Sequence, residues 1–389
     1  MKLVKLSLAA IVAAGAMTTF ASATPLEEAI KGVDVSGFAR YRFYHQSDAV
    51  YSDNSTQRNR FSGLLNIVSP ITDNIKFGVS LSTDKNDYAS NSASASGSID
   101  VNKFWFQYAN DALTVKAGKI EIPTPWTESG FGGTRGNGIL ALVTAVPDWT
   151  FAAAYYMQTN AMNSNTLSTY TGGGTWNVAR GVAYDGIMGE EDLGAIAAIG
   201  KVGPVGLQLW AARMTNVFDY AIFGEASFAM EGFNVKGQAN YLKLADETKG
   251  LGADDAGIFY GIQAGYKSDM FFVDLGYTKT DDDQPIYVLD GDNDGFIKFG
   301  KQLYYLTQNT PDQKVFFGKA GFSYDKFGFE AGYGHSKSGF VNDDKDEFYG
   351  QLAYKVAKNF GLQLYYSVLD SDDNSEDNNE LRFQALYNF

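Results

Sequence analysis

The sequence predicts an all-β fold, a transmembrane antiparallel β-barrel of about 18 strands with short periplasmic turns and long outer loops. Three observations predict it. Apolar and polar residues alternate with a period of two over nearly every recognisable segment, the connections alternate between short and long, and the chain ends in an aromatic strand. A period of two is typical of strands whose two faces meet different surroundings.

The first 23 residues are predicted to be a cleaved signal peptide. Lys2 and Lys5 form a positive start, residues 6–17 are apolar, and Ala21-Ser22-Ala23 offers the small residues of a cleavage site. This order is typical of secretory signals. The apolar run is shorter than the ~20 residues that a membrane-spanning helix requires.

Residues 24–32 are predicted to form a short helix or lead-in, because Thr24, Pro25 and Glu27 fit an N-cap, a first-turn proline and the acid of a capping box. The barrel then covers 33–389.

Cysteine is absent, and the chain holds 24 Tyr and 28 Phe. This composition favours a barrel with aromatic girdles over a disulfide-stapled secreted domain. The net charge of −14 lacks the basic footprint of nucleic-acid binders, so no nucleic acid is expected as a partner.

The alternation is clearest at the two ends of the barrel. In the first strand, Val35, Ala39 and Tyr41 lie on one face, and Arg40 and Arg42 lie on the other. Segments 75–82 and 271–278 follow the same rhythm. In the last strand, Leu381, Phe383, Ala385, Tyr387 and Phe389 alternate with polar residues. We expect the barrel-assembly machinery to recognise this strand by its terminal Phe389.

The connections give the strand number. Short links are predicted near 70–73, 110–112, 146–148, 202–204, 231–232, 268–269, 325–326 and 358–359. Long ones are predicted near 45–56, 85–98, 122–137, 159–190, 244–256, 281–313, 338–346 and 371–379, with a shorter one near 214–218. Together they join about 18 strands, an even number that leaves both termini on the periplasmic side. A soluble β-sandwich could also alternate, but it would not sort its loop lengths by end.

The two ends of the chain resemble the Campylobacter-type major outer membrane porins. The similar stretches are Thr24–Lys31, Val33–Gly37 followed by Arg40-Tyr41-Arg42, and Leu381–Phe389. The middle of the chain is similar only in its strand rhythm. The resemblance implies an 18-stranded trimeric general porin, with a constricting third loop and calcium bound inside the pore.

Strand alternation also predicts a basic wall on the lumen face of the first five strands and the last one. Closure of the barrel places the last strand beside the first, and Asp34 and Glu380 are the only clear acids on this face. Barrel lumens are commonly polar with charges of both signs, which is the alternative to a functional ladder. The predicted ladder comprises Arg40, Arg42, Arg58, Arg60, Lys76, Lys103, Lys116 and Arg382.

The third long loop, near 120–137, is predicted to fold inward and narrow the lumen. It contains Glu121, Glu128 and Arg135. Acids opposite the arginines would create a transverse field, in which unit charges 4–8 Å apart interact by roughly 1–4 kcal/mol. The alternative is an ordinary surface loop with Pro and Gly turn chemistry.

A calcium site is a further candidate, although no cofactor is required. Asp290, Asp292 and Asp294 match the first half of a calcium-binding loop, but Lys301 stands where the bidentate acid is expected. Clusters of Asp and Gly are also common in turns. The family resemblance implies calcium held by carboxylates near the third loop instead, with Glu128 the best-placed match.

The acidic runs Asp281–Asp283, Asp343–Asp346 and Asp370–Asp377 fall in predicted outer loops. Divalent cations could bridge them to lipopolysaccharide, but a solvated, mutually repelling loop is the default expectation. The only histidines, His45 and His335, belong to no catalytic pattern. Enzyme activity is therefore not expected.

These observations predict an outer-membrane porin through which ions and small hydrophilic solutes diffuse passively. Two alternatives stay open. The wall suggests a substrate-specific channel for anions such as phosphate. Large aromatics predicted to face inward, such as Trp105 and Phe272, suggest a filled structural or adhesive barrel that binds through its outer loops. The sequence does not fix ion selectivity: the acidic composition and the resembled family favour cations, whereas the wall favours anions.

Overall fold

The computed structural model describes residues 32–48, 55–88, 98–129, 133–160, 190–246, 256–282, 289, 293, 295–305, 310–339, 343–372 and 377–389. The predicted signal peptide and nearly all of the predicted lead-in, 24–32, lie outside these ranges. Among the described residues, none forms a helix of the length and apolarity needed to span a membrane.

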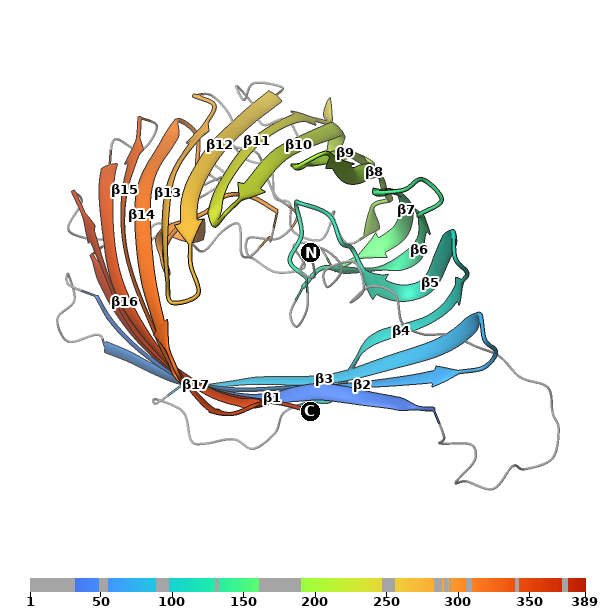
Figure 1. Cartoon of the computed structure of the whole chain (residues 1–389), viewed down its shortest axis with the longest axis horizontal. Coiled ribbons are helices and arrows are strands. Elements are labelled where there is room, and N and C mark those ends of the chain that lie inside the picture. Colours follow the sequence, from blue (N-terminus) through green and yellow to red (C-terminus); the bar gives the residue numbers. More distant parts are fainter. Residues whose placement is uncertain are drawn as a thin grey trace.

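The part of the chain that the structure describes forms one closed sheet of 18 antiparallel strands (Figure 1). Each strand pairs with its neighbours in sequence, and β1 also pairs with β18, with Arg42 opposite Gln384. The predicted fold class is therefore confirmed. The strands are β1 Asp34–Asp48, β2 Ser55–Pro70, β3 Ile75–Tyr88, β4 Asp100–Ala109, β5 Leu113–Glu121, β6 Arg135–Val143, β7 Trp149–Thr159, β8 Leu193–Val202, β9 Val205–Met214, β10 Phe218–Met230, β11 Phe233–Leu244, β12 Ala256–Lys267, β13 Phe271–Thr280, β14 Gln313–Tyr324, β15 Phe327–Ser338, β16 Asp343–Ala357, β17 Phe360–Ser371 and β18 Asn378–Asn388.

Large apolar side chains cover the outside of the barrel. Leu275, Phe316 and Phe348 are 62%, 57% and 58% exposed, whereas their neighbours Phe317 and Tyr349 face inward and are buried. In water, so many exposed apolar side chains would promote aggregation. In a membrane barrel they form the expected lipid-facing belt. Closure leaves no open strand edge in the hydrocarbon, where unpaired backbone groups would be costly.

One acidic run lies differently from its prediction. Residues 343–346 belong to β16 rather than to an outer loop, because β15 and β16 extend to Ser338 and Asp343 and pair there. The alternation of the strand then separates the run. Asp343 faces inward and is buried, while Asp346 faces outward beside His335.

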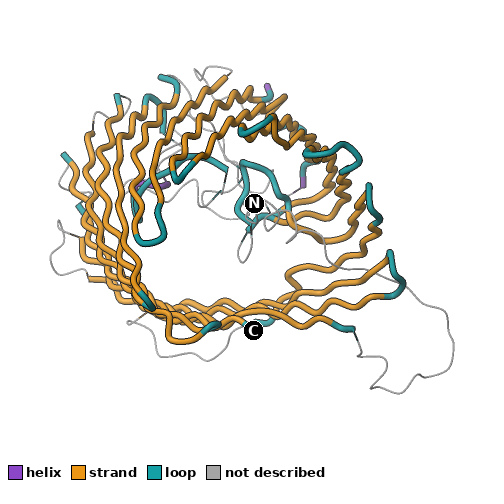
Figure 2. The backbone as a smooth tube through the Cα atoms, viewed as in Figure 1, coloured by secondary structure: helices purple, strands orange, loops and turns teal. Residues whose placement is uncertain are grey.

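The inside of the barrel is apolar over much of its circumference. Leu140 and Leu142 of β6, Tyr156 of β7 and Trp210 of β9 belong to one buried cluster that continues through β10–β12. Two inward segments cover this surface, and Figure 2 shows loop segments inside the ring of strands. They are defined here as the first inner segment, residues 122–134, of which 130–132 are not described, and the second inner segment, residues 295–305.

The first inner segment reaches across the barrel to β10 and β11. Trp126 is buried, its indole Nε1 donates a hydrogen bond to Asn240 Oδ1 at 2.9 Å, and its ring lies 6.4 Å from that of Phe223. Register places Asn240 between Phe223 and Phe259 on three neighbouring strands.

The second inner segment meets the first at the same place. Phe296 packs against Phe223 and Phe259, with ring centroids 5.2 and 5.0 Å apart. A Cβ added to Gly295 would overlap Pro125 of the first inner segment. The two segments therefore touch over an aromatic cluster.

Trp126→Ala is expected to lower the free energy of unfolding by about 3–5 kcal/mol, because it leaves a cavity and an unsatisfied Asn240. Urea unfolding of the reconstituted barrel measures this. Phe322→Ala, which removes a half-exposed ring from the outer face, serves as the control and should cost less. Equal losses for the two variants would mean that Trp126 does not hold the first inner segment.

Candidate functional site

Polar side chains gather on the inner face of β18, β1, β2 and β3, which is defined here as the polar wall. Hydrogen bonds join it from strand to strand. Arg42 Nε donates to Gln384 Oε1 at 2.6 Å, Arg40 Nη2 donates to Ser62 Oγ at 3.3 Å, and Ser80 Oγ donates to an oxygen of Asn66 at 2.6 Å.

Tyr44 lies at the centre of the polar wall. Register sets it directly opposite Arg58 on β2 and Arg382 on β18. The two guanidinium carbons lie 4.3 and 5.9 Å from the centroid of its ring, and Arg42 Nη1 donates to its hydroxyl at 3.1 Å. Guanidinium groups are attracted to the faces of aromatic rings. Tyr44 therefore holds three arginines close together despite their like charges.

The alternation of cationic groups and tyrosine rings continues onto β17, β16 and the second inner segment. Arg382 lies 4.4 Å from the ring centroid of Tyr365, its direct partner across the strands. Lys301 Nζ lies 5.6 Å from the ring centroid of Tyr365 and 4.3 Å from that of Tyr349. These six residues are defined here as the cation–tyrosine row, in the order Arg58, Tyr44, Arg382, Tyr365, Lys301 and Tyr349.

Carboxylates contact the cation–tyrosine row mainly by accepting hydrogen bonds from its tyrosine hydroxyls. The hydroxyl of Tyr365 donates to Glu380, and that of Tyr349 donates to Glu330 Oε1 at 2.8 Å. Lys301 Nζ is 3.4 Å from the same Glu330 oxygen. Among the described residues, no carboxylate lies within ion-pair distance of Arg58 or Arg382. Within the described part of the chain, neither guanidinium group therefore forms an ion pair.

The structure separates the predicted ladder into groups. Arg42, Arg58 and Arg382 meet around Tyr44, while Arg60 forms an ion pair with Asp84 at 2.6 Å. Arg40 lies one step along β1, over the ring of Phe38. Lys116 lies over Trp105, 3.9 Å from its centroid. Lys76 shares a face of β3 with Ser80 and stands apart near the short-turn end.

The acids of the third loop are not arranged as a simple counter-field. Glu121 ends β5 and forms an ion pair with Lys103 at 2.6 Å, so these two predicted residues neutralise each other. Arg135 begins β6 and is buried. The backbone carbonyl of Glu128 accepts a hydrogen bond from Thr134 at 3.2 Å, and its side chain is half-buried.

Asp290, Asp292 and Asp294 lie outside the described residues. Within the described ranges, no three His, Cys, Asp or Glu side chains are grouped so that they could hold a metal ion. Calcium binding by these aspartates and Glu128 therefore stays a prediction.

Sequence reasoning missed the tyrosines and Lys301. Tyr44 has the same strand parity as Arg42, so alternation could have placed it in the lumen. Lys301 lies in a loop, where no periodicity reports direction, and its place in the row depends on tertiary packing.

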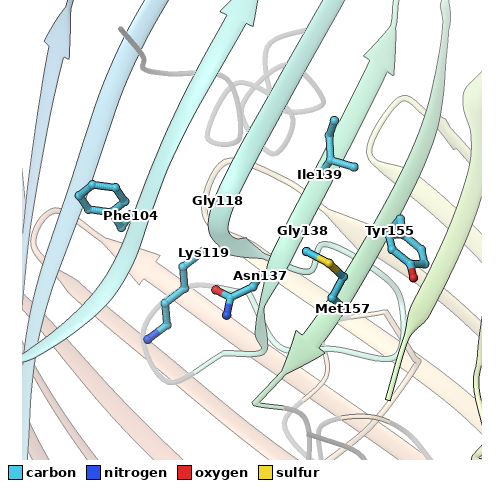
Figure 3. A pocket seen from close by; sticks show the side chains of 8 residues that line it. All are labelled: Phe104, Gly118, Lys119, Asn137, Gly138, Ile139, Tyr155 and Met157. Atoms are coloured by element: carbon cyan, nitrogen blue, oxygen red, sulfur yellow. The ribbon is translucent and has the colours of Figure 1, made fainter. Parts of the chain in front are cut away.

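A separate hollow lies on the outer face of β4–β7 (Figure 3). Ile139, Tyr155 and Met157 line it and are about half-exposed, and Gly118 and Gly138 leave its floor bare. A second hollow continues over β6–β9 between Ala141, Ala153 and Ala211. Both face away from the lumen, so neither belongs to the cation–tyrosine row.

The fold is shared with solved outer-membrane proteins. Pseudomonas aeruginosa OpdQ is 14% identical with a TM-score of 0.71, covering 92% of this chain and 98% of that chain. A BenF-like porin from Pseudomonas fluorescens Pf-5 is 10% identical with a TM-score of 0.71 and the same coverages. Pseudomonas aeruginosa OprD is 13% identical with a TM-score of 0.67, covering 92% of this chain and 93% of that chain. At these identities the likeness shows the fold alone.

The sequence comparison identifies the family. No curated protein sequence matches the chain. The model of the Campylobacter major outer membrane protein family matches residues 1–389, which is the whole chain. The closed barrel and its polar wall agree with this match. The chain therefore belongs to the Campylobacter major outer membrane protein family and is a porin channel of the Gram-negative outer membrane.

Proposed function

We propose that ions and small hydrophilic solutes diffuse passively along the polar wall, past the cation–tyrosine row. The observation behind this proposal is the unequal filling of the barrel. The first inner segment and Phe296 of the second pack on the apolar inner surface of β5–β12, and the rest of the second packs on β14–β17. The polar wall instead carries charged and amide side chains. Water and hydrated solutes favour the side that offers hydrogen bonds and charge.

A second candidate is a channel selective for anionic solutes, favoured by Arg58 and Arg382, which form no ion pair among the described residues. A guanidinium offers a planar fork of donors that fits a carboxylate or phosphate. Stacking on Tyr44 and Tyr365 fixes these groups in place without neutralising them. A saturable site would let micromolar to millimolar anionic solute block the ion current, whereas a general pore would not respond.

The double variant Arg58→Gln/Arg382→Gln is expected to lower the chloride-to-potassium permeability ratio about two- to tenfold, because each removes a charge that acts at close range. The reversal potential of single channels under a KCl gradient measures this. Lys319→Gln is the control, since that lysine lies 3.7 Å from Asp274 and outside the row. An unchanged ratio in the double variant would remove the row from the conduction path. A wild-type barrel that inserts and passes no current would contradict the diffusion pathway itself.

We further propose that the barrel forms a homotrimer through the flank β5–β9. Small outward-facing residues, among them Ala141, Ala153 and Ala211, allow the backbone of a second copy to approach closely. The strands are also short here, with nine residues each in β5 and β6 against 16 in β2.

Ala153→Trp is expected to convert the trimer into monomers, because the indole would fill the hollow that a neighbouring copy occupies. Light scattering of the detergent-solubilised protein gives the mass. Ala331→Trp, on the outer face of β15, should leave the trimer intact. A trimer that survives Ala153→Trp would place the interface elsewhere.

Other partners follow from the sequence and remain proposals. The barrel-assembly machinery would recognise β18, whose terminal Phe389 is half-exposed and stacks on Tyr387. Outer loops would face lipopolysaccharide, and calcium would bind near Asp290, Asp292, Asp294 and Glu128. We also propose that the chain catalyses no reaction, since its family and fold are those of a channel.

A further inference from the structure

The second inner segment is attached to the barrel by one buried carboxylate. Glu347 of β16 is 0% exposed. Its oxygens accept hydrogen bonds from the backbone N–H groups of Lys301 at 2.7 Å, Gln302 at 3.1 Å and Leu303 at 2.9 Å. The hydroxyl of Ser367 donates to it at 2.7 Å.

The four hydrogen bonds compensate the cost of burying the Glu347 carboxylate. A buried carboxylate without partners is very unfavourable, and hydrogen bonds to a charged acceptor are among the strongest in proteins. The three backbone N–H groups depend on Glu347 in return, because buried unsatisfied donors are also costly. The carboxylate and the segment therefore stabilise each other.

Gly300 allows the backbone to wrap around this carboxylate. Its φ is +96°, a conformation that other residues adopt only with strain. A Cβ at this position would also overlap the Glu347 carboxylate. Glycine is thus required twice, for the turn and for the close approach.

The remaining contacts hold the second inner segment against the inner face of β11, β14 and β17. Gln238 bridges its start, donating to the carbonyl of Gly295 and accepting from the N–H of Ile297, both at 2.7 Å. Near its end, the Gln302 amide donates to Ser367 at 3.0 Å. Between them, Phe299 stacks on Phe317, with centroids 5.1 Å apart.

We propose that Glu347 is a positioning residue that latches the second inner segment against the inner face of the barrel and so keeps the channel open. Because the barrel wall lies behind the segment, release would let it move into the lumen. The same latch holds Lys301 in the cation–tyrosine row. This inference rests on the proposed diffusion pathway.

Glu347→Gln is expected to make partial closures of single-channel current about tenfold more frequent, because the loss of charge weakens several hydrogen bonds at once. Gly300→Ala should give the same closures by a separate route. Asp274→Asn is the matched control, since it removes one lumen carboxylate that pairs with Lys319 and does not touch the segment. A disulfide between Gln302→Cys and Ser367→Cys should restore steady current in the Glu347→Gln protein.

A second measurement does not depend on current. The chain has no cysteine, and Leu303 is fully buried. A Leu303→Cys thiol should resist a polar maleimide in the otherwise native barrel and react once Glu347→Gln is added. Retained heat-modifiable migration on gels checks that the barrel is folded. Steady current and a protected thiol in both latch variants would overturn the latch. A barrel that conducts no current but shows the thiol difference would overturn the diffusion pathway and leave the latch standing.

Discussion

The structure depends first on the need to satisfy every backbone hydrogen bond within lipid. A sheet that spans the hydrocarbon has to close, and the pairing of β1 with β18 does this. Closure of 18 strands leaves an interior wider than one layer of side chains can fill. The two inner segments occupy part of that interior, and the polar wall lines another part.

The division of the interior also orders the charges. Where the inner segments pack, much of the barrel lining is aliphatic and aromatic, as at Leu140 and Phe223. Where they do not, the register of β18, β1 and β2 sets Tyr44 between Arg58 and Arg382. Aromatic faces keep like charges together without neutralising them. Lys301 belongs both to the second inner segment and to the cation–tyrosine row, so the proposed selectivity depends on the position of that segment.

Most of the fold could be predicted from the sequence, because a period of two and sorted loop lengths report directly on strands. Strand parity similarly placed Arg42 and Arg382 on one face. Loops carry no such periodicity, so the Trp126–Asn240 hydrogen bond could not be anticipated. The Lys103–Glu121 ion pair joins β4 to the last residue of β5, a residue that the sequence assigns to the third loop. Glu347 directly follows an acidic run that resembles a solvated loop, and only the tertiary structure shows it buried.

The central claim is that solutes pass along the polar wall and not through the apolar side. Single cysteines introduced into the cysteine-free chain test it directly, when a charged thiosulfonate reagent is added during single-channel recording. Gln384→Cys lies beside Arg42 on the polar wall, and Ala197→Cys lies in the buried apolar cluster. The account predicts a stepwise fall in conductance for Gln384→Cys and no change for Ala197→Cys. The reverse pattern would contradict it.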